Sequence, residues 1–115
     1  MKLTKEKCVP CQGGEPTVTE KEMAELKPQV PDWQVVEKEG ANRLKRTFEF
    51  EDFAGALDFT NQVGEIAEEE GHHPRLVTEW GKVTVTWWTH KIDGLHRNDF
   101  IMAAKTDDLY RDGST

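Results

Sequence analysis

The sequence predicts an α+β fold of two layers, in which helices cover one face of a four-stranded antiparallel sheet in the order α-β-β-α-β-β-α. Three observations lead to this prediction. Alternating apolar and polar residues indicate two pairs of strands, and turn residues within each pair indicate hairpins. An apolar residue every three or four positions indicates a long helix between the hairpins. Shorter helical segments stand at both ends, so consecutive hairpins with helices on one face form the domain.

The chain has 115 residues, which is enough for one domain with one core. Its net charge of −7 argues against nucleic acid or an anionic membrane as the main partner, because phosphate groups are bound by clustered Lys and Arg. No apolar run approaches the length of a membrane span, and the first residues contain no apolar signal segment. We therefore expect a soluble, cytoplasmic protein.

We expect residues 1–17 to form a flexible arm and residues 18–112 to form a single domain, since Pro and Gly punctuate the arm without any period. The two cysteines of the chain, Cys8 and Cys11, form a C-x-x-C pair in this arm. A redox pair would open a helix in a βαβ unit, and a zinc site would need a second ligand pair. The redox role and the zinc role both stay open, and so does the third possibility that the two cysteines are reduced and have no function.

The first helix is predicted to begin at a capping box, in which Thr19 and Glu22 each bond to the backbone amide of the other, and to end before Pro28. Strands are then predicted over 33–39 and 43–50. In the first strand Trp33 and Val35 are expected to share a face, and in the second the buried face is expected to hold Leu44, Phe48 and Phe50, interrupted by Arg46.

The long helix is predicted from Asp52, its N-cap, to Gly71, the residue that follows its last turn. Three carboxylates in that last turn, Glu68 to Glu70, oppose the helix dipole. Because Glu68 lies one turn before His72, we expect a local contact between the two. The apolar stripe is expected to comprise Phe53, Ala56, Leu57, Thr60, Val63, Gly64 and Ala67.

The second hairpin is predicted over 75–80 and 82–89, followed by a helix over about 97–110 that carries Asp99 in its first turn. Alternation in the later strand places Val83, Val85 and Trp87 on the core face. It places Thr84, Thr86, Trp88 and His90 on the other face, so His90 is expected at the end of the strand and outside the core.

Three of the four histidines, His72, His73 and His90, are the candidate functional residues. Three imidazoles and a water can bind catalytic zinc, although two adjacent rings do not readily reach one ion. The histidines could also merely form hydrogen bonds in turns. Acid–base chemistry on a small polar ligand is the third interpretation, because the imidazole pKa lies closest to neutrality and Glu68, Trp88 and Asp99 are nearby.

The chain resembles the pterin-4a-carbinolamine dehydratase family over roughly residues 19–110. Upstream, Trp33 and the run from Phe48 to Phe53 belong to the resemblance. The motifs that carry it are Glu68-x-x-x-His72-His73-Pro74, Trp80-x-Lys82-Val83-x-Val85, Thr89-His90 and Gly94-Leu95-x-x-x-Asp99-Phe100.

The resemblance implies dehydration of 4a-hydroxytetrahydropterin to quinonoid dihydropterin and water, in tetrahydrobiopterin recycling, with no metal or other cofactor. It implies that His72, His73 and His90 are the active-site histidines. We expect His72 and His90 to transfer protons and His73 to bind the pterin. By position, the supporting residues are Glu68, which orients His72, Pro74, Thr89 and Asp99.

Two residues depart from the family pattern. His96 stands where many members have Thr or Ser, so the capping box before the last helix is expected to lose its hydroxyl. His96 itself is expected in an exposed turn. Trp88 stands where a small residue is common, and would either stack on the pterin or lie at the surface or a subunit interface.

The resemblance also implies a second class of function, because family members serve as dimerisation partners of a transcription factor or as assembly factors in carbon fixation. Exposed sheet edges favour a homodimer or homotetramer. A link to an aromatic amino-acid hydroxylase is a further expectation. The sequence does not indicate which pterin is preferred.

Overall fold

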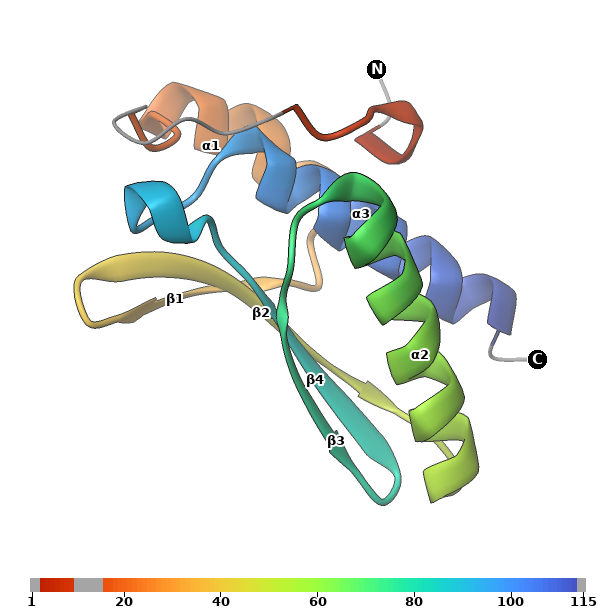
Figure 1. The fold of residues 1–115 in the computed structure, drawn as a ribbon. Coiled ribbons are helices and arrows are strands. Elements are labelled where there is room, and N and C mark those ends of the chain that lie inside the picture. The colour runs from red at the N-terminus through yellow and green to blue at the C-terminus, as the bar shows by residue number, and fades with distance from the viewer. Residues whose placement is uncertain (1–2, 10–15, 114–115) are drawn as a thin grey trace.

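The computed structural model describes residues 3–9 and 16–113 and has the predicted α+β architecture (Figure 1). None of the helices within these ranges combines the length and apolar character needed to cross a membrane. The helices and strands are α1 (Glu20–Leu26), β1 (Gln34–Lys38), β2 (Ala41–Glu49), α2 (Phe53–Glu70), β3 (Arg75–Glu79), β4 (Lys82–Trp87) and α3 (Arg97–Gly113), with short 3-10 helices at Leu3–Lys5, Lys27–Gln29 and His90–Ile92.

The four strands form one antiparallel sheet in the order β1-β2-β4-β3, so the two hairpins meet through β2 and β4. Both α2 and α3 lie on the same side of this sheet (Figure 1). The N-terminal caps of α1 and α2 are those that the sequence predicts. Thr19 and Glu22 form the capping box of α1, and the Asp52 side chain accepts from the Gly55 amide at the start of α2.

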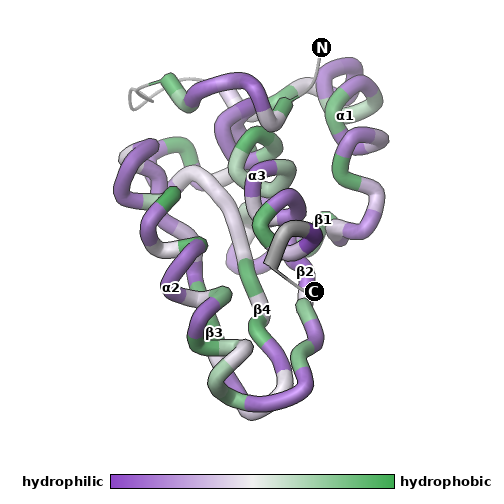
Figure 2. The backbone as a smooth tube through the Cα atoms, turned by 90° about the vertical axis from the view of Figure 1, so that its right-hand side faces the viewer, coloured by the Kyte–Doolittle hydropathy of each residue, from purple (hydrophilic) through white to green (hydrophobic). Residues whose placement is uncertain are grey.

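The core lies between the sheet and the two long helices. Leu44 pairs with Trp87 and Phe48 with Val83 across the two central strands, and all four side chains are buried. Along α2 and α3, hydrophobic and hydrophilic stretches alternate (Figure 2). That pattern lets each helix bury one side against the sheet and leave the other in water. The central strands therefore fix the place from which the loop after β4 and the helix α3 continue.

One predicted face is partly wrong. In α2 the buried residues are Ala56, Phe59, Val63 and Ala67, whereas Phe53 and Leu57 are 45% and 43% exposed. The Phe59 ring lies 4.8 Å from that of Phe48, so aromatic packing turns the helix toward Phe59. Val35, in the edge strand β1, is 39% exposed although it pairs with the buried Leu44.

Arg46 interrupts the apolar face of β2, as predicted, and its guanidinium is bonded to a carboxylate of α3. Its Nη1 lies 2.6 Å from Oδ1 of Asp107, an oxygen that also accepts a bond from Nε1 of Trp33 at 2.8 Å. Burial raises the pKa of the Asp107 carboxyl, against the opposing effect of these two bonds. This network connects β2 to α3 through an ion pair.

Residues 3–9, which we expected to belong to a flexible arm, are packed against the domain. Leu3 is buried in the core, and Arg97 forms two hydrogen bonds to the carboxylate of Glu6, at 2.9 and 2.7 Å. The segment therefore lies along α3. Cys11, the second cysteine of the predicted C-x-x-C pair, is outside the described residues.

Candidate active site

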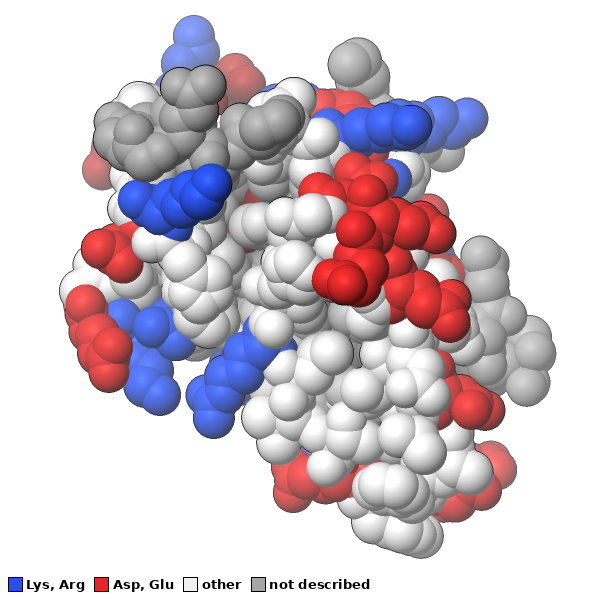
Figure 3. Space-filling view, viewed as in Figure 1, with Lys and Arg blue, Asp and Glu red and all other residues white. Residues whose placement is uncertain are grey.

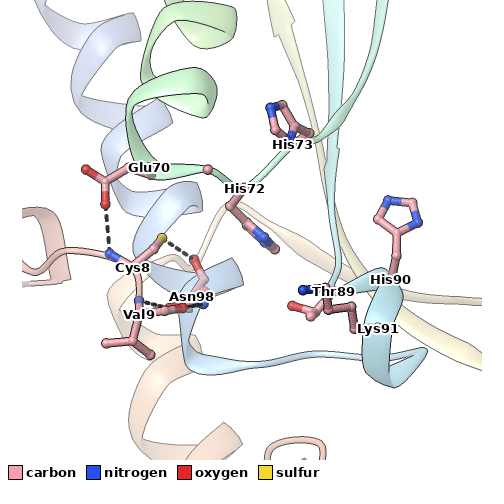
Figure 4. Close-up of a pocket in the computed structure, with 10 residues that line it drawn as sticks. Cys8, Val9, Glu70, His72, His73, Thr89, His90, Lys91 and Asn98 are labelled. Atoms are coloured by element: carbon pink, nitrogen blue, oxygen red, sulfur yellow. Dashed lines mark hydrogen bonds between the residues drawn. The ribbon is translucent and has the colours of Figure 1, made fainter. Parts of the chain in front are cut away.

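A cavity of about 400 Å³ lies where the end of α2, the turn after β4, the start of α3 and the N-terminal segment meet (Figure 4). Its size suits a small bicyclic ligand. All three candidate histidines contribute to its wall. The lining residues are Cys8, Val9, Glu70, Gly71, His72, His73, Thr89, His90, Lys91 and Asn98.

The backbone at the end of α2 places His72 at the cavity. Gly71 has φ +65°, a left-handed conformation that glycine adopts without strain. The amide of His72 then bonds to the carbonyl of Ala67 at 3.1 Å, and that of Gly71 to the carbonyl of Glu68 at 3.4 Å. This pair of bonds is a Schellman motif, which ends a helix in a fixed direction. The motif therefore fixes the direction in which the chain leaves α2, and with it the position of His72 at the cavity.

The imidazole of His72 is held by two further contacts. Its Nε2 lies 2.5 Å from Oδ1 of Asp99, which is completely buried at the start of α3. Its ring stacks on Trp87 with an interplanar angle of 13° and a centroid distance of 5.7 Å. A carboxylate only accepts hydrogen bonds, so the neutral imidazole carries its proton on Nε2 and leaves Nδ1 as an acceptor.

The other carboxylate oxygen of Asp99, Oδ2, also accepts hydrogen bonds. It accepts from Oγ1 of Thr89 and from the backbone amide of His96, both at 2.9 Å. The expected loss of the capping hydroxyl at His96 does not remove the cap, because Nδ1 of His96 accepts from the amide of Asn98 at 3.0 Å. His96 is half-buried rather than exposed and does not line the cavity.

His73 is paired with Glu68, which corrects the expected contact between Glu68 and His72. Nε2 of His73 bonds to Oε2 of Glu68, and both side chains are largely exposed. The reason is the turn at Gly71, which directs His72 toward α3 and leaves His73 above the last turn of α2. Acidic side chains gather over this end of α2 (Figure 3), where Glu65, Glu68 and Glu69 line a separate groove.

His90 lines the cavity from the side opposite the N-terminal segment (Figure 4), but it does not stand at the end of a strand. The strand β4 ends at Trp87, and His90 begins a 3-10 helix. The alternation stops there because Thr89 pairs with Gly94 and closes a loop. The His90 ring lies 4.4 Å from the ring of Trp88, and the Arg43 guanidinium lies 4.0 Å from the centre of the same Trp88 ring.

Four of the predicted residues do not line the cavity. Asp99 and Glu68 are instead bonded to His72 and His73, which do line it. Trp88 is outside the wall, next to His90, and Pro74 lies between His73 and β3. Conversely, the cavity wall contains residues that the sequence did not connect with the histidines, namely Cys8, Val9, Glu70, Gly71, Lys91 and Asn98. A signal for Glu70 was present, because a carboxylate at a helix C-terminus is electrostatically unfavourable and requires an explanation.

Chemically, the arrangement offers imidazoles in two different environments around one cavity. His72 is oriented by a buried carboxylate, whereas His73 and His90 are open to solvent. Across residues 3–9 and 16–113, no three or more His, Cys, Asp or Glu side chains are grouped so that they could hold a metal ion. The arrangement can exchange protons with a ligand in the cavity.

The turn at Gly71 can be tested by stability measurements. The change Gly71→Ala is expected to lower the free energy of unfolding by about 1–2 kcal/mol, because alanine is strained in the left-handed conformation. No atom lies within 4 Å of an added Cβ, so this cost is conformational rather than steric. Urea denaturation monitored by circular dichroism gives the measurement.

A matched control is Gly64→Ala in the middle of α2, where an added Cβ also meets no atom within 4 Å. There alanine is expected to raise the free energy of unfolding by about 0.5–1 kcal/mol, because it loses less backbone entropy than glycine. Equal effects of the two substitutions would show that the left-handed turn does not determine stability.

Comparison with known proteins identifies relatives over nearly the whole chain. Residues 16–109 match the family described as pterin 4 alpha carbinolamine dehydratase. A protein of Microcystis aeruginosa, provisionally named a pterin-4-alpha-carbinolamine dehydratase, is 57% identical over 109 residues, which are 95% of this chain and 94% of that protein. A protein of Chlorobium limicola with the same provisional name is 62% identical over 104 residues, covering 90% and 91% of the two chains.

Solved structures agree with the fold. The crystal structure of a transcriptional coactivator/pterin dehydratase from Brucella melitensis has a TM-score of 0.74 at 34% identity, covering 82% of this chain and 98% of that one. A pterin dehydratase-like protein, described as a RuBisCO assembly factor in the alpha-carboxysome, shares the fold with a TM-score of 0.59 at 24% identity, covering 68% and 88%. Sequence and structure together show that the chain belongs to the pterin-4a-carbinolamine dehydratase family.

Proposed function

We propose that the protein is a 4a-hydroxytetrahydropterin dehydratase. The observation that carries the proposal is the geometry of His72, which is fixed by buried Asp99 at the wall of a cavity that His73 and His90 also line. Family membership supports the same reaction. We further propose that the substrate is 4a-hydroxytetrahydrobiopterin, that the reaction serves its recycling beside an aromatic amino-acid hydroxylase, and that it takes place in the cytoplasm.

The reaction needs two proton transfers. The C4a–O bond breaks and its electron pair leaves with the oxygen, which must be protonated because hydroxide is a poor leaving group. The N5–H bond breaks as well, and its electrons form the C4a=N5 double bond of the quinonoid dihydropterin. One group therefore gives a proton to the oxygen and another takes one from N5, and both should titrate near neutrality.

We assign these steps to His72 and His90. Asp99 holds the Nε2 proton of His72, so Nδ1 is the nitrogen that can accept a proton, which favours His72 as the base. His90, exposed on the other side of the cavity, is then the acid. His73, whose Nε2 is bonded to Glu68, is assigned to pterin binding.

The experiment is an absorbance assay of 4a-hydroxytetrahydrobiopterin breakdown with and without the native protein, in a buffer where the uncatalysed reaction is slow. Catalysis of this breakdown supports the proposal. A purely protein-binding role, the second candidate function, predicts no acceleration, and the exposed apolar surface described next is the observation that favours it.

We propose that the protein is a homodimer or homotetramer. Phe53, Leu57 and Trp80 are large apolar side chains that are 45%, 43% and 72% exposed. Phe53 and Leu57 are neighbours on α2, and the bond from the Phe50 amide to the Gly81 carbonyl brings the start of α2 close to the turn after β3. An apolar surface of this kind is typical of an interface, and a second copy of the chain would cover it.

Light scattering coupled to size-exclusion chromatography is expected to show a multiple of 13.2 kDa for the native protein. The change Leu57→Glu is expected to shift the mass toward the monomer, because it buries a charge at the contact. The change Asp58→Lys, at the next position of the same helix, is the control. A native mass of 13.2 kDa would contradict the oligomer.

A further inference from the structure

The N-terminal segment from Glu6 to Val9 is attached to the rim of the cavity by hydrogen bonds at three successive points. Outermost is the bidentate pair between Glu6 and Arg97. Next, the amide of Cys8 donates to Oε1 of Glu70 at 2.8 Å. Last, Val9 and Asn98 bond reciprocally, since the Val9 amide donates to Oδ1 at 3.0 Å and Nδ2 donates to the Val9 carbonyl at 2.7 Å.

The bond to Glu70 explains a carboxylate that the helix itself does not favour. Glu70 is the last residue of α2, where a negative charge opposes the helix dipole. Its oxygen instead accepts from the Cys8 amide, 62 positions away along the chain. A charge-assisted bond to a backbone amide is among the stronger hydrogen bonds. Glu70 is thus placed to fix the segment rather than to stabilise the helix.

The hydrogen bonds leave an apolar surface toward the cavity. Both amide atoms of Asn98 and Oε1 of Glu70 are engaged with the backbone of Cys8 and Val9. What the segment adds to the wall is the Val9 side chain, in a residue that is 57% exposed, and the Cys8 thiol. Burial raises the pKa of this thiol to about 12, and the charge of Glu70 adds to the effect, so the group is neutral.

The cavity therefore has two unlike sides (Figure 4). Cys8 and Val9 form one side, and Thr89, His90 and Lys91 form the other, with His72 between them. Binding sites of this size combine apolar contacts with a few polar groups that fix orientation. A flat heterocycle that reacts at the histidines would meet the N-terminal segment with a part that does not react.

We propose that residues 6–9, fastened by Glu70 and Asn98, form the apolar binding wall of the active site and set the affinity for the non-reacting part of the pterin. This inference rests on the proposed function for the identity of the ligand. The segment acts in binding, so its release lowers the fraction of protein that is competent to bind and raises KM, whereas kcat stays near the native value.

The first test compares substitutions in the last turn of α2. The change Glu70→Ala is expected to raise KM about fivefold, which corresponds to a segment in place about one fifth of the time. The change Glu70→Gln keeps an acceptor oxygen for the Cys8 amide and is expected to restore the native KM. The change Glu69→Ala is the control, because that carboxylate lines the acidic groove instead. In all three variants kcat is expected within about twofold of native.

The second test does not depend on turnover. With Cys11→Ser leaving Cys8 as the single thiol, the rate of alkylation of Cys8 is measured with and without saturating 7,8-dihydrobiopterin, an unreactive pterin. The pterin is expected to slow alkylation at least about fivefold if it covers the wall. The change Val9→Ser, which keeps the backbone bonds and removes apolar contact, is expected to raise the pterin concentration that gives half-maximal protection.

The outcomes separate the two proposals. If the native protein catalyses dehydration but Glu70→Ala has the native KM and the pterin does not protect Cys8, the binding wall is refuted and the dehydratase stands. If the native protein does not catalyse dehydration, the proposed reaction is refuted. The binding wall is then judged by the alkylation experiment alone: protection of Cys8 by the pterin supports the wall, and no protection refutes it.

Discussion

Replacing His72 by glutamine is expected to lower kcat by about 10²- to 10⁴-fold, which is the usual contribution of one general acid or base. Glutamine can still donate to Asp99 from its amide, so the loss comes from proton transfer and not from collapse of the site. His72 is nearly buried, and its ring stacks on Trp87. KM is expected to change by less than about threefold. Steady-state kinetics on 4a-hydroxytetrahydrobiopterin gives both constants.

Parallel variants test the division of roles. His90→Gln is expected to resemble His72→Gln, whereas His73→Gln is expected to raise KM with a smaller effect on kcat. His96→Ser is the control histidine, because serine can replace its Nδ1 as the cap of the Asn98 amide. A result in which only His73→Gln abolishes turnover, while the other two change only KM, would reverse the roles proposed for these residues.

Replacing Asp99 by asparagine is the second large expected effect. The buried carboxylate accepts three hydrogen bonds, from His72, Thr89 and the His96 amide. An amide of the same shape has one acceptor oxygen and one NH2 group. If the NH2 faces His72, the imidazole must move its proton to Nδ1 and loses the acceptor proposed for catalysis. We expect kcat to fall at least about 100-fold.

The same substitution is expected to lower the free energy of unfolding by about 1–3 kcal/mol, because the bonds that the buried carboxylate accepts are charge-assisted and those of a neutral amide are weaker. A control is Thr89→Val, which removes one of the three donors and keeps the shape of the side chain. It is expected to leave most of the activity, since His72 keeps its bond to Asp99. If the Asp99→Asn variant is destabilised but has the native kcat, the role of Asp99 is limited to capping α3, and its proposed role in orienting His72 for catalysis is wrong.

Local patterns predicted most of the fold because its strands and helix ends are determined by residues that are close together in the sequence. Alternation identified both hairpins, and the caps at Thr19 and Asp52 depend on neighbours three residues away. The buried side of α2 was harder to predict. Phe53 and Phe59 have the same hydrophobicity, and the rings they would meet on the sheet decide which is buried. Periodicity alone contains no information about those rings.

The candidate site was predicted in its residues more than in its contacts. The sequence pointed to His72, His73 and His90, which do line one cavity. It paired Glu68 with His72, because helical spacing was extended past Gly71, where the left-handed turn ends the helix. The contribution of residues 6–9 depends on contacts between residues that are more than 60 positions apart in the chain. A local sequence pattern does not indicate such contacts.

The dehydration rate of one double variant tests the central claim most directly. The initial rate with 4a-hydroxytetrahydrobiopterin is measured for the native protein, for His72→Gln with His90→Gln, and for the uncatalysed reaction, with circular dichroism showing that both proteins are folded. The account predicts a native rate well above the uncatalysed one and a double variant close to it. A native protein no faster than buffer, or a double variant as fast as native, would contradict a histidine acid–base site.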